Sequence, residues 1–432
     1  MESLLHYVWK HRLYLPDNFQ TSENQAIEVI DPGIYNSDAG PDFFNAKIKI
    51  DGEIWAGNIE FHTHSNDWYK HKHHADNAYD SVILHIVESI DKEDIITKSG
   101  RKIPQLILKI PNHIQANYEY LLKQDNPIPC LPRIREIPAI YWSDWKNTLT
   151  IERLERKTQT IFQLLDEYLD DWNEVFYITL ARNFGFGINN DAFERLAKSL
   201  PFKYILKYCD SPQQTEALFL GQAGLLENDS FPDEYYRQLK NEYRFLSQKY
   251  DLKPLDASIF KSLRIRPNNF PHIKLVQLAG FIAKGQTLFS QILDKNNLKE
   301  FQMLFVSEVN EYWESHYHFE KTSPRKKKSL SLSAIHILLI NTVVPILFAY
   351  GKRKNREIFI QKSLELLENI PSERNHIITH FEKYGVESLH AADSQALIQL
   401  KRAYCEAKKC IYCRIGHRLL NKNFHDFTPN FG

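Results

Sequence analysis

Alternating hydrophobic and polar positions mark the first part of the chain and predict a small sheet. Residues 46–50 alternate isoleucine with lysine, and residues 53–62 continue as a returning strand after Asp51-Gly52, a dipeptide that favours a tight hairpin turn. The pattern predicts an α+β domain over residues 1–125, built on an antiparallel sheet. Its other expected elements are a short helix at 2–14, strands at 27–30, 82–87 and 105–110, and a loop or short helix at 65–80.

After residue 127 the hydrophobic period changes to that of helices. From Ile151 to Leu165 apolar residues recur at helical spacing, with charged residues on the opposite side. No fixed internal repeat is visible. We therefore expect an all-α domain over residues 126–432, and α+β as the class of the whole chain. Further amphipathic runs are 191–199, 212–226, 233–249, 273–284, 297–319, 332–350, 355–369 and 388–415.

Composition and charge exclude several classes of protein. The 432 residues are 43% hydrophobic and carry 54 basic and 54 acidic side chains, so no global basic field attracts nucleic acid. Nucleic acid is a partner only through a local patch, and the basic runs at 325–328 and 352–354 are either solvated loops or phosphate contacts. The N-terminus has no secretory pattern, and the most apolar stretch, 335–350, is shorter than a membrane span and predicts a buried helix. With five cysteines, an odd count, we expect a cytoplasmic protein that does not contact a membrane.

Residues 40–87 concentrate the side chains that carry chemistry. Six of the 18 histidines lie between His62 and His85, together with several aspartates and glutamates. A buried carboxylate or imidazole costs free energy unless it has a partner, so packed cores rarely contain such a mixture. Metal sites and acid–base sites require it. We expect the functional site in this window.

The predicted hairpin brings Asp42 close to Glu60 and His62. Glu60 and His62 point to the same face of their strand, and a turn at Asp51-Gly52 places Asp42 opposite them. Two carboxylates directed at one point need a proton or a cation between them. The divalent ion expected here is Mg²⁺ or Mn²⁺, held by Asp42 and Glu60.

The order Pro41-Asp42, hairpin, Glu60-x-His62 resembles the core of the PD-(D/E)XK nucleases. In that core an Asp and a Glu or Asp hold Mg²⁺, and a lysine two residues later orients the attacking water. The resemblance implies catalytic roles for Asp42, Glu60 and His62. His62 stands at the lysine position, where an imidazole can position or deprotonate water but lacks the fixed charge of lysine.

A second interpretation uses histidines as the main ligands. Glu60, His62 and His64 would then form one ligand set on a single strand, which suits Zn²⁺, Fe²⁺ or Mn²⁺. A structural alternative also stands: Asp42 caps a turn, Glu60 pairs with a lysine, and His85 is a satisfied core histidine. The candidates for supporting or alternative ligands are His64, Asp67, His71, His74 and His85, with His73 beside them.

Two arginines are candidates for substrate binding. Arg264 and Arg266 precede a proline-bounded turn, and their guanidinium groups can grip a phosphate or a carboxylate. They can equally pair with carboxylates at helix ends. A role in substrate binding requires the helical domain to fold over the N-terminal site.

A cysteine-rich motif lies near the C-terminus. The spacing C-x4-C-x2-C-x3-H fits a structural Zn²⁺ site, and its first three positions have a spacing that also occurs in iron–sulfur ligation, with the fourth cysteine taken from Cys130 or Cys209. In one straight helix the four residues would fall within an arc of ~140°, which cannot surround an ion. Buried structural cysteines are then the simpler explanation. The motif consists of Cys405, Cys410, Cys413 and His417.

Several blocks of the sequence resemble the DUF2851 family of bacterial proteins of unknown function. The resemblance implies a bacterial, cytosolic protein and implies no activity. The leading hypothesis is a metal-dependent, nuclease-like phosphodiester hydrolase; the alternatives are a non-catalytic scaffold or interaction protein and a Zn/Fe/Mn-binding metalloprotein. The blocks lie at 40–48, 59–87, 264–279 and 393–416.

Overall fold

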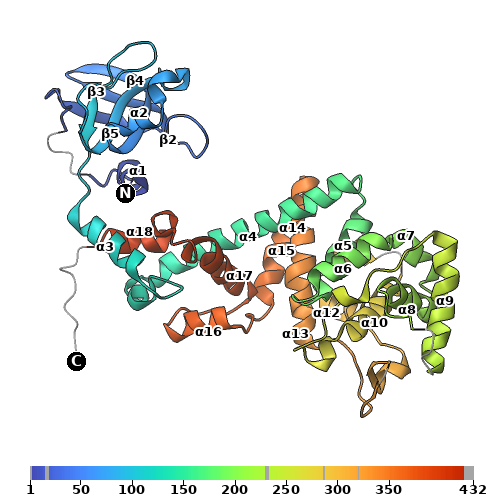
Figure 1. Ribbon diagram of the computed structural model, residues 1–432. Helices are drawn as coiled ribbons and strands as arrows, with labels where there is room; N and C mark the ends of the chain where they lie inside the picture. The colour runs from blue at the N-terminus through green and yellow to red at the C-terminus, as the bar shows by residue number, and fades with distance from the viewer. Residues whose placement is uncertain (1, 15–18, 229–232, 286–287, 320, 423–432) are drawn as a thin grey trace, which may run out of the picture. The chain divides into compact units, whose positions relative to one another are not determined.

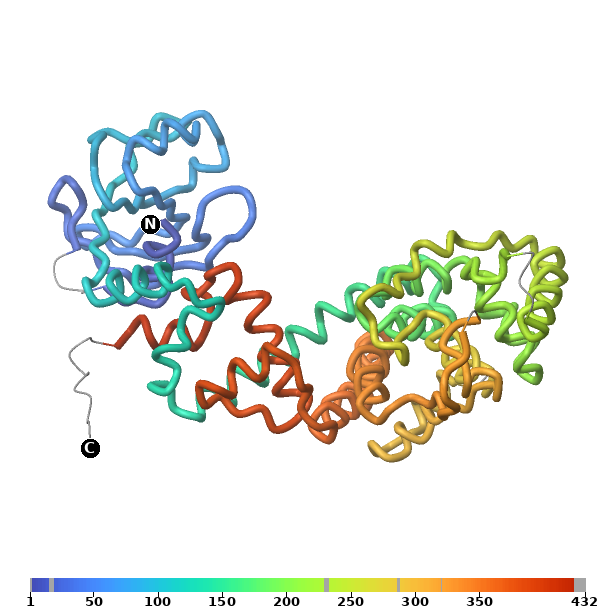
Figure 2. The backbone as a smooth tube through the Cα atoms, turned by 60° about the horizontal axis from the view of Figure 1, so that its bottom comes forward, coloured from blue at the N-terminus to red at the C-terminus, as the bar shows by residue number. Residues whose placement is uncertain are grey.

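The computed structural model describes residues 2–14, 19–228, 233–285, 288–319 and 321–422. It consists of two compact units (Figure 1). Unit 1 combines Met1–Trp145 with Lys401–Gly432, and unit 2 is Lys146–Leu400. This division differs from the expected boundary at residue 125. The C-terminal segment packs beside α3 (Asn112–Lys123), where Asn117 donates to the carbonyl groups of Leu420 and Lys422 (Figure 2).

Unit 1 contains a mixed sheet in the order β1-β3-β4-β5-β6, with β2 paired to β3. The α+β class is confirmed. Strands β1, β3 and β4 pair antiparallel as expected, but β4 with β5 and β5 with β6 pair in parallel. The parallel arrangement follows from the long connection between β4 and β5, which is long enough for a crossover. The elements are α1 (Glu2–Lys10), β1 (Ile27–Asp31), β2 (Ile34–Tyr35), β3 (Phe43–Ile50), β4 (Glu53–His64), α2 (Asp67–Lys70), β5 (Val82–Ser89), β6 (Gln105–Ile107), α3, the start of α4 (Ala139–Glu167) and α18 (Arg414–Leu420).

The β3–β4 hairpin turns where the sequence predicts. Ile50 pairs with Glu53, and both turn residues, Asp51 and Gly52, have positive φ, as the tight hairpin turn requires. Further along, the register shifts and Phe43 pairs with Ile59. This register places the residue just before β3, Asp42, beside the last third of β4.

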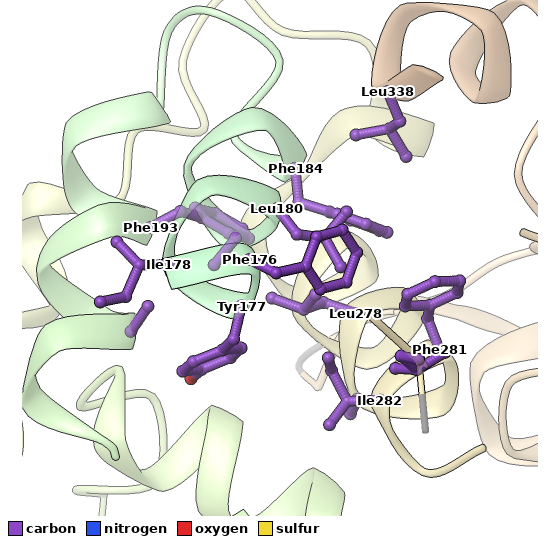
Figure 3. Packing of buried hydrophobic residues seen from close by; sticks show 14 of the residues in the cluster. Phe176, Tyr177, Ile178, Leu180, Phe184, Phe193, Leu278, Phe281, Ile282 and Leu338 are labelled. Carbon is purple, nitrogen blue, oxygen red and sulfur yellow. The ribbon is translucent and has the colours of Figure 1, made fainter. Parts of the chain in front are cut away.

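Unit 2 is helical around one large apolar core. Phe176, Leu180 and Phe184 of α5 pack against Leu278 and Phe281 of α10 (Figure 3). The helices are the remainder of α4, α5 (Trp172–Phe184), α6 (Asn190–Ser199), α7 (Phe202–Ile205), α8 (Pro212–Gln222), α9 (Glu234–Tyr250), α10 (Pro271–Ile282), α11 (Leu288–Asp294), α12 (Leu298–Leu304), α13 (Leu332–Leu338), α14 (Val344–Arg353), α15 (Glu357–Asn369), α16 (His376–Lys383) and α17 (Ala391–Gln399).

Three expected helices have different bounds. The run at 297–319 is helical only to Leu304, and its end forms β7 (His316–His318), which pairs with β8 (Lys321–Thr322). The run at 388–415 is not one α-helix, because α17 ends at Gln399 and a π-helix, Leu400–Cys405, follows. The apolar run continues as a helix over Leu332–Arg353, which at 22 residues is long enough to cross a membrane, but 67% of its most apolar window is buried inside unit 2, as in a core helix.

Candidate metal centre

Asp42 and Glu60 meet at the edge of the β3–β4 hairpin. The Asp42 N–H donates to Glu60 Oε2 (3.1 Å), and the Phe61 N–H donates to Asp42 Oδ2 (3.0 Å). The Asp42 side chain therefore accepts the hydrogen bond of a β4 backbone N–H at the position where β3 begins. The Glu60 side chain is almost fully buried, with 7% of its surface exposed, whereas the Asp42 side chain is 22% exposed. The Asp42 carboxylate lies close enough to Glu60 to raise the pKa of Glu60.

Three imidazoles gather beside Glu60. One ring nitrogen from each of His62, His71 and His73 lies within 4.8 Å of the others. His62 Nε2 is 3.0 Å from His71 Nδ1, and Glu60 Oε1 is 3.2 Å from His73 Nε2 and 3.9 Å from His62 Nε2. The 3.2 Å contact lacks hydrogen-bond geometry, so His73 Nε2 is a buried nitrogen without a hydrogen-bond partner among the described residues. The four side chains form a donor set of three nitrogens and one oxygen.

Local structure explains why these residues converge. Glu60 and His62 alternate with Phe61 along β4 and share one face of the sheet. The crossover then returns over this face, where Trp68 of α2 contacts the ring of His85. His71 follows α2, and His73 begins a 3₁₀ turn. His85, fully buried on β5, orients His62 through a 2.8 Å bond from its Nε2 to His62 Nδ1, which leaves His62 Nε2 facing the cluster.

Burial, together with the neighbouring Asp42 carboxylate, raises the pKa of Glu60 to about 9. Without a cation, Glu60 is therefore protonated at neutral pH. A divalent ion at Glu60 Oε1 would favour the ionised form and displace this proton. Such a strongly shifted carboxyl beside a second carboxylate is typical of functional sites.

The pKa values of His62, His73 and His85 are lowered, which favours their neutral forms. Burial, with the nearby imidazoles of His85 and His73, lowers the pKa of His62 to about 2. Burial lowers the pKa of His85 to about 3, and burial with His71 lowers the pKa of His73 to about 4. A neutral imidazole has a free nitrogen lone pair, and this is the form of histidine that binds metal ions.

Three of the expected supporting residues lie outside this cluster. His64 is exposed and bonds Ser89 Oγ at 2.7 Å, so the strand set of Glu60, His62 and His64 does not form. Asp67 instead accepts the His64 N–H and pairs with Lys70 at 2.7 Å. The ring of His74 lies against that of Tyr69. Strand alternation predicts which residues share a face of β4, but it does not predict where the chain after β4 places its side chains.

Two residues of the first helix reach the site, and the sequence analysis did not identify them. His6 Nε2 lies 3.2 Å from Asp42 Oδ2. Burial raises the pKa of Glu2, on which His6, Asp42 and His71 also act electrostatically. Glu2, His6 and Lys10 are four residues apart, so they share one face of α1. That spacing is the only signal in the sequence that could have revealed them.

His6 and Lys10 of this face also line a pocket of about 420 Å³ in unit 1. Lys10 and two arginines of α18, Arg414 and Arg418, supply positive charge, and Asp144, the one acidic residue in the lining, is paired with Arg414. The Arg418 guanidinium stacks on the ring of Tyr141 at 3.7 Å. Further lining residues are Ser3, His6, Tyr7, His11, Tyr35, Ile411, Tyr412, Cys413 and His417.

The other candidate phosphate contacts lie in unit 2. Arg264 and Arg266 are exposed there, and their role in substrate binding stays a prediction. In the basic run at 325–328, Arg325 pairs with two glutamates of the same unit, and Lys328 is buried against Tyr317 at 4.0 Å. Internal partners therefore already occupy both ends of that run.

Comparison with known families identifies the chain. The model of DUF2851, a protein family of unknown function, matches residues 2–376. The chain belongs to this family. The matched range includes the whole candidate centre, whereas the cysteine block at 393–416 lies beyond it. Neither the curated proteins nor the solved structures contain a match.

Proposed function

We propose that this DUF2851 protein is a divalent-metal-dependent hydrolase of phosphodiester bonds. The convergence of Glu60 with His62, His71 and His73 is the observation that carries the proposal. Three imidazole nitrogens from β4 and the crossover lie within 4.8 Å of one another, and Glu60 Oε1 lies 3.2 Å from one of them, His73 Nε2. This nitrogen is buried without a hydrogen-bond partner among the described residues. An ion at this point would bind the His73 Nε2 lone pair and would favour the ionised form of Glu60.

The donor set favours a transition metal. Imidazole nitrogens suit Zn²⁺ and Fe²⁺, and Mn²⁺ also accepts carboxylate oxygen, whereas Mg²⁺ prefers an all-oxygen shell. Of the two ions expected from the nuclease-core resemblance, Mn²⁺ therefore fits better than Mg²⁺. Asp42 is bonded through its own N–H to Glu60 and lies next to this shell rather than within the three-histidine set.

When bound, the ion supplies charge stabilisation for a phosphoryl group and lowers the pKa of a water molecule. Asp42 is more exposed than Glu60 and is held by the Phe61 N–H, so it is placed to accept a proton from the attacking water. His6 Nε2 lies 3.2 Å from the same carboxylate oxygen. His62 keeps the orientation that His85 imposes on it.

The pocket beside the centre supports an anionic substrate. His6 lines the pocket and contacts Asp42, so the pocket and the carboxylates share a wall. Lys10 and Arg418 can bind phosphate oxygens, and Tyr35 and Tyr141 offer rings on which a base can stack. These features, together with the Asp42 and Glu60-x-His62 pattern, favour a phosphodiester over other hydrolysable bonds.

The deciding experiment uses the full chain purified without a histidine tag and stripped with a chelator. Calorimetric titration with Mn²⁺, Zn²⁺ and Mg²⁺ measures binding, and bis(4-nitrophenyl) phosphate and a single-stranded oligonucleotide measure hydrolysis. We expect Mn²⁺ or Zn²⁺ to bind and to restore hydrolysis, with Mg²⁺ much weaker. Binding without hydrolysis would leave a non-catalytic metalloprotein, and an absence of binding would overturn the proposal.

Replacing Lys10 with alanine tests the pocket. We expect Lys10→Ala to raise KM for the oligonucleotide about tenfold with little change in kcat, because a charged hydrogen bond to the substrate is lost while the centre stays intact. Steady-state kinetics at fixed salt measures both constants. Lys47→Ala, at an exposed position of β3, is the matched control. An equal rise in KM in both variants would remove the pocket from the substrate path.

A further inference from the structure

Unit 2 contains a pocket of its own, with a volume of about 500 Å³. Its wall combines the loop after α8, α9, the segment from Ala257 to Phe270, the first turn of α10 and the end of β7. A cavity of this size suits a small molecule. None of the residues assigned above to the histidine centre or to the pocket of unit 1 lines it.

Aromatic rings form the apolar part of this wall. Tyr236, Phe270 and Phe319 line the pocket. The rings of Tyr236 and Phe319 meet edge to face at 4.9 Å, and the ring of Phe270 lies 6.4 Å from that of His318, another lining residue. Rings that are packed against one another in this way offer flat apolar surfaces, on which a planar ring of a ligand can stack.

Helix α10 begins at the pocket. Phe270 and His272, on either side of Pro271 at the first helical position, both line it. No side chain caps the first turn, and the backbone bonds of the helix begin at the Lys274 N–H, which donates to the Phe270 carbonyl group at 3.0 Å. Proline has no N–H, so within the described part of the chain the N–H groups of His272 and Ile273 are left for a ligand. Such a helix end attracts a phosphate group.

The side chain of His272 gives a second, independent indication of a ligand. Its Nδ1 is buried and has no hydrogen-bond partner among the described residues. The ring lies 5.7 Å from that of Phe319 and 6.5 Å from that of His318. Burial, together with the His318 imidazole, lowers the pKa of His272 to about 4, so the ring is neutral at pH 7. A buried polar nitrogen without a partner inside the protein is rare and is explained by a group that the pocket would receive.

Two arginines flank the pocket. Arg264 and Arg266 lie between Ser262 and Phe270, and both of these end residues belong to the lining. The arginines are exposed, and neither pairs with a carboxylate of the described residues, so the expected alternative of pairing at a helix end is not found. Their guanidinium groups remain available for phosphate oxygens, which arginine binds with two parallel hydrogen bonds.

We propose that the pocket of unit 2 binds a nucleoside monophosphate. The base would stack on the aromatic wall, and its amino groups or the sugar hydroxyls would bond to Glu227, an acidic residue of the lining. The phosphate would take the N–H groups at the start of α10 and the nearby arginines. A volume of about 500 Å³ holds one nucleotide but not a nucleic-acid strand. The proposal does not depend on the histidine centre, because the two sites share no residue.

The test is calorimetric titration of the metal-free full chain with AMP, GMP, CMP and UMP, and with adenosine and inorganic phosphate at the same salt concentration. We expect at least one monophosphate to bind. Adenosine and inorganic phosphate should bind at least about tenfold more weakly, because each fills only a part of the pocket and loses one set of contacts.

Two substitutions locate the ligand. Ser262→Trp places a large ring at an exposed position of the lining and should lower the affinity at least about tenfold, whereas Ser258→Trp, exposed in the 3₁₀ turn at Ala257–Ile259 and outside the lining, is the matched control. Arg266→Ala should weaken the monophosphate about tenfold and leave adenosine unchanged. The thermal midpoint of each variant shows that it is folded.

Three results would overturn the proposal. The first is the absence of binding by all four monophosphates. The second is adenosine binding as tightly as AMP, which would remove the phosphate from the site. The third is undiminished binding by Ser262→Trp; if Lys10→Ala abolishes binding instead, the ligand occupies the pocket of unit 1. None of these results bears on metal binding or hydrolysis at the histidine centre.

Discussion

Glu60→Gln is expected to weaken binding of the activating metal by roughly 100-fold or more and to reduce hydrolysis to background. Glutamine has the shape of glutamate, and its carbonyl can still accept the Asp42 N–H. It cannot ionise, so the ion loses the one negative ligand of the cluster. Calorimetry of the stripped protein and hydrolysis of bis(4-nitrophenyl) phosphate measure the two effects.

The same substitution separates function from folding. Because the buried Glu60 carboxyl has a pKa of about 9, it is already neutral at pH 7 without metal, and a neutral amide should be tolerated there. The thermal midpoint of the metal-free variant should therefore match that of the wild type. Glu53→Gln, at the exposed start of the same strand, is the matched control. Unchanged metal affinity in Glu60→Gln would remove the carboxylate from the centre.

The local signals in the sequence were sufficient for the hairpin and for most of the helices. Asp51-Gly52 fixed the turn, and the period of two along 53–62 fixed which residues share a face, so the approach of Asp42 to Glu60 followed directly. The pairing direction of β5 was not encoded in this way. It depends on the path of the crossover, and the same path decides that His73 rather than His64 approaches Glu60.

Residues that reach a site from distant parts of the chain could not be predicted from local sequence patterns. Glu2 and His6 reach the centre because α1 packs on the sheet, where the His6 ring contacts Phe61. The thiol of Cys413, far along the chain, raises the pKa of Cys130. Periodicity reports which face of an element is apolar, but it does not report which other element covers that face.

Acidification from pH 7 to pH 5 is expected to destabilise unit 1. His62, His73 and His85 have pKa values of about 2, 4 and 3 in the folded chain, below the ordinary value of 6.5. Their contribution to stability is present above pH 6.5 and is lost as the pH falls. In this range the unfolded chain binds protons at these histidines, whereas the folded chain does not. Each histidine contributes on the order of 2 kcal/mol to this loss by pH 5. Glu60 acts in the opposite direction: its raised pKa means that its contribution is present below pH 4.5 and is lost as the pH rises toward 9.

The slope of the unfolding free energy against pH isolates this effect. Removing one buried imidazole, in His85→Gln, should make the slope between pH 6 and pH 5 shallower by about 1 kcal/mol per pH unit, since one fewer proton is taken up on unfolding. Denaturant unfolding of the metal-free chain at several pH values measures the slope. His64→Gln, at the exposed end of the neighbouring strand β4, is the matched control. An identical slope in His85→Gln and wild type would mean that the buried histidines already carry protons in the folded chain, and such protonated imidazoles could not hold a metal ion.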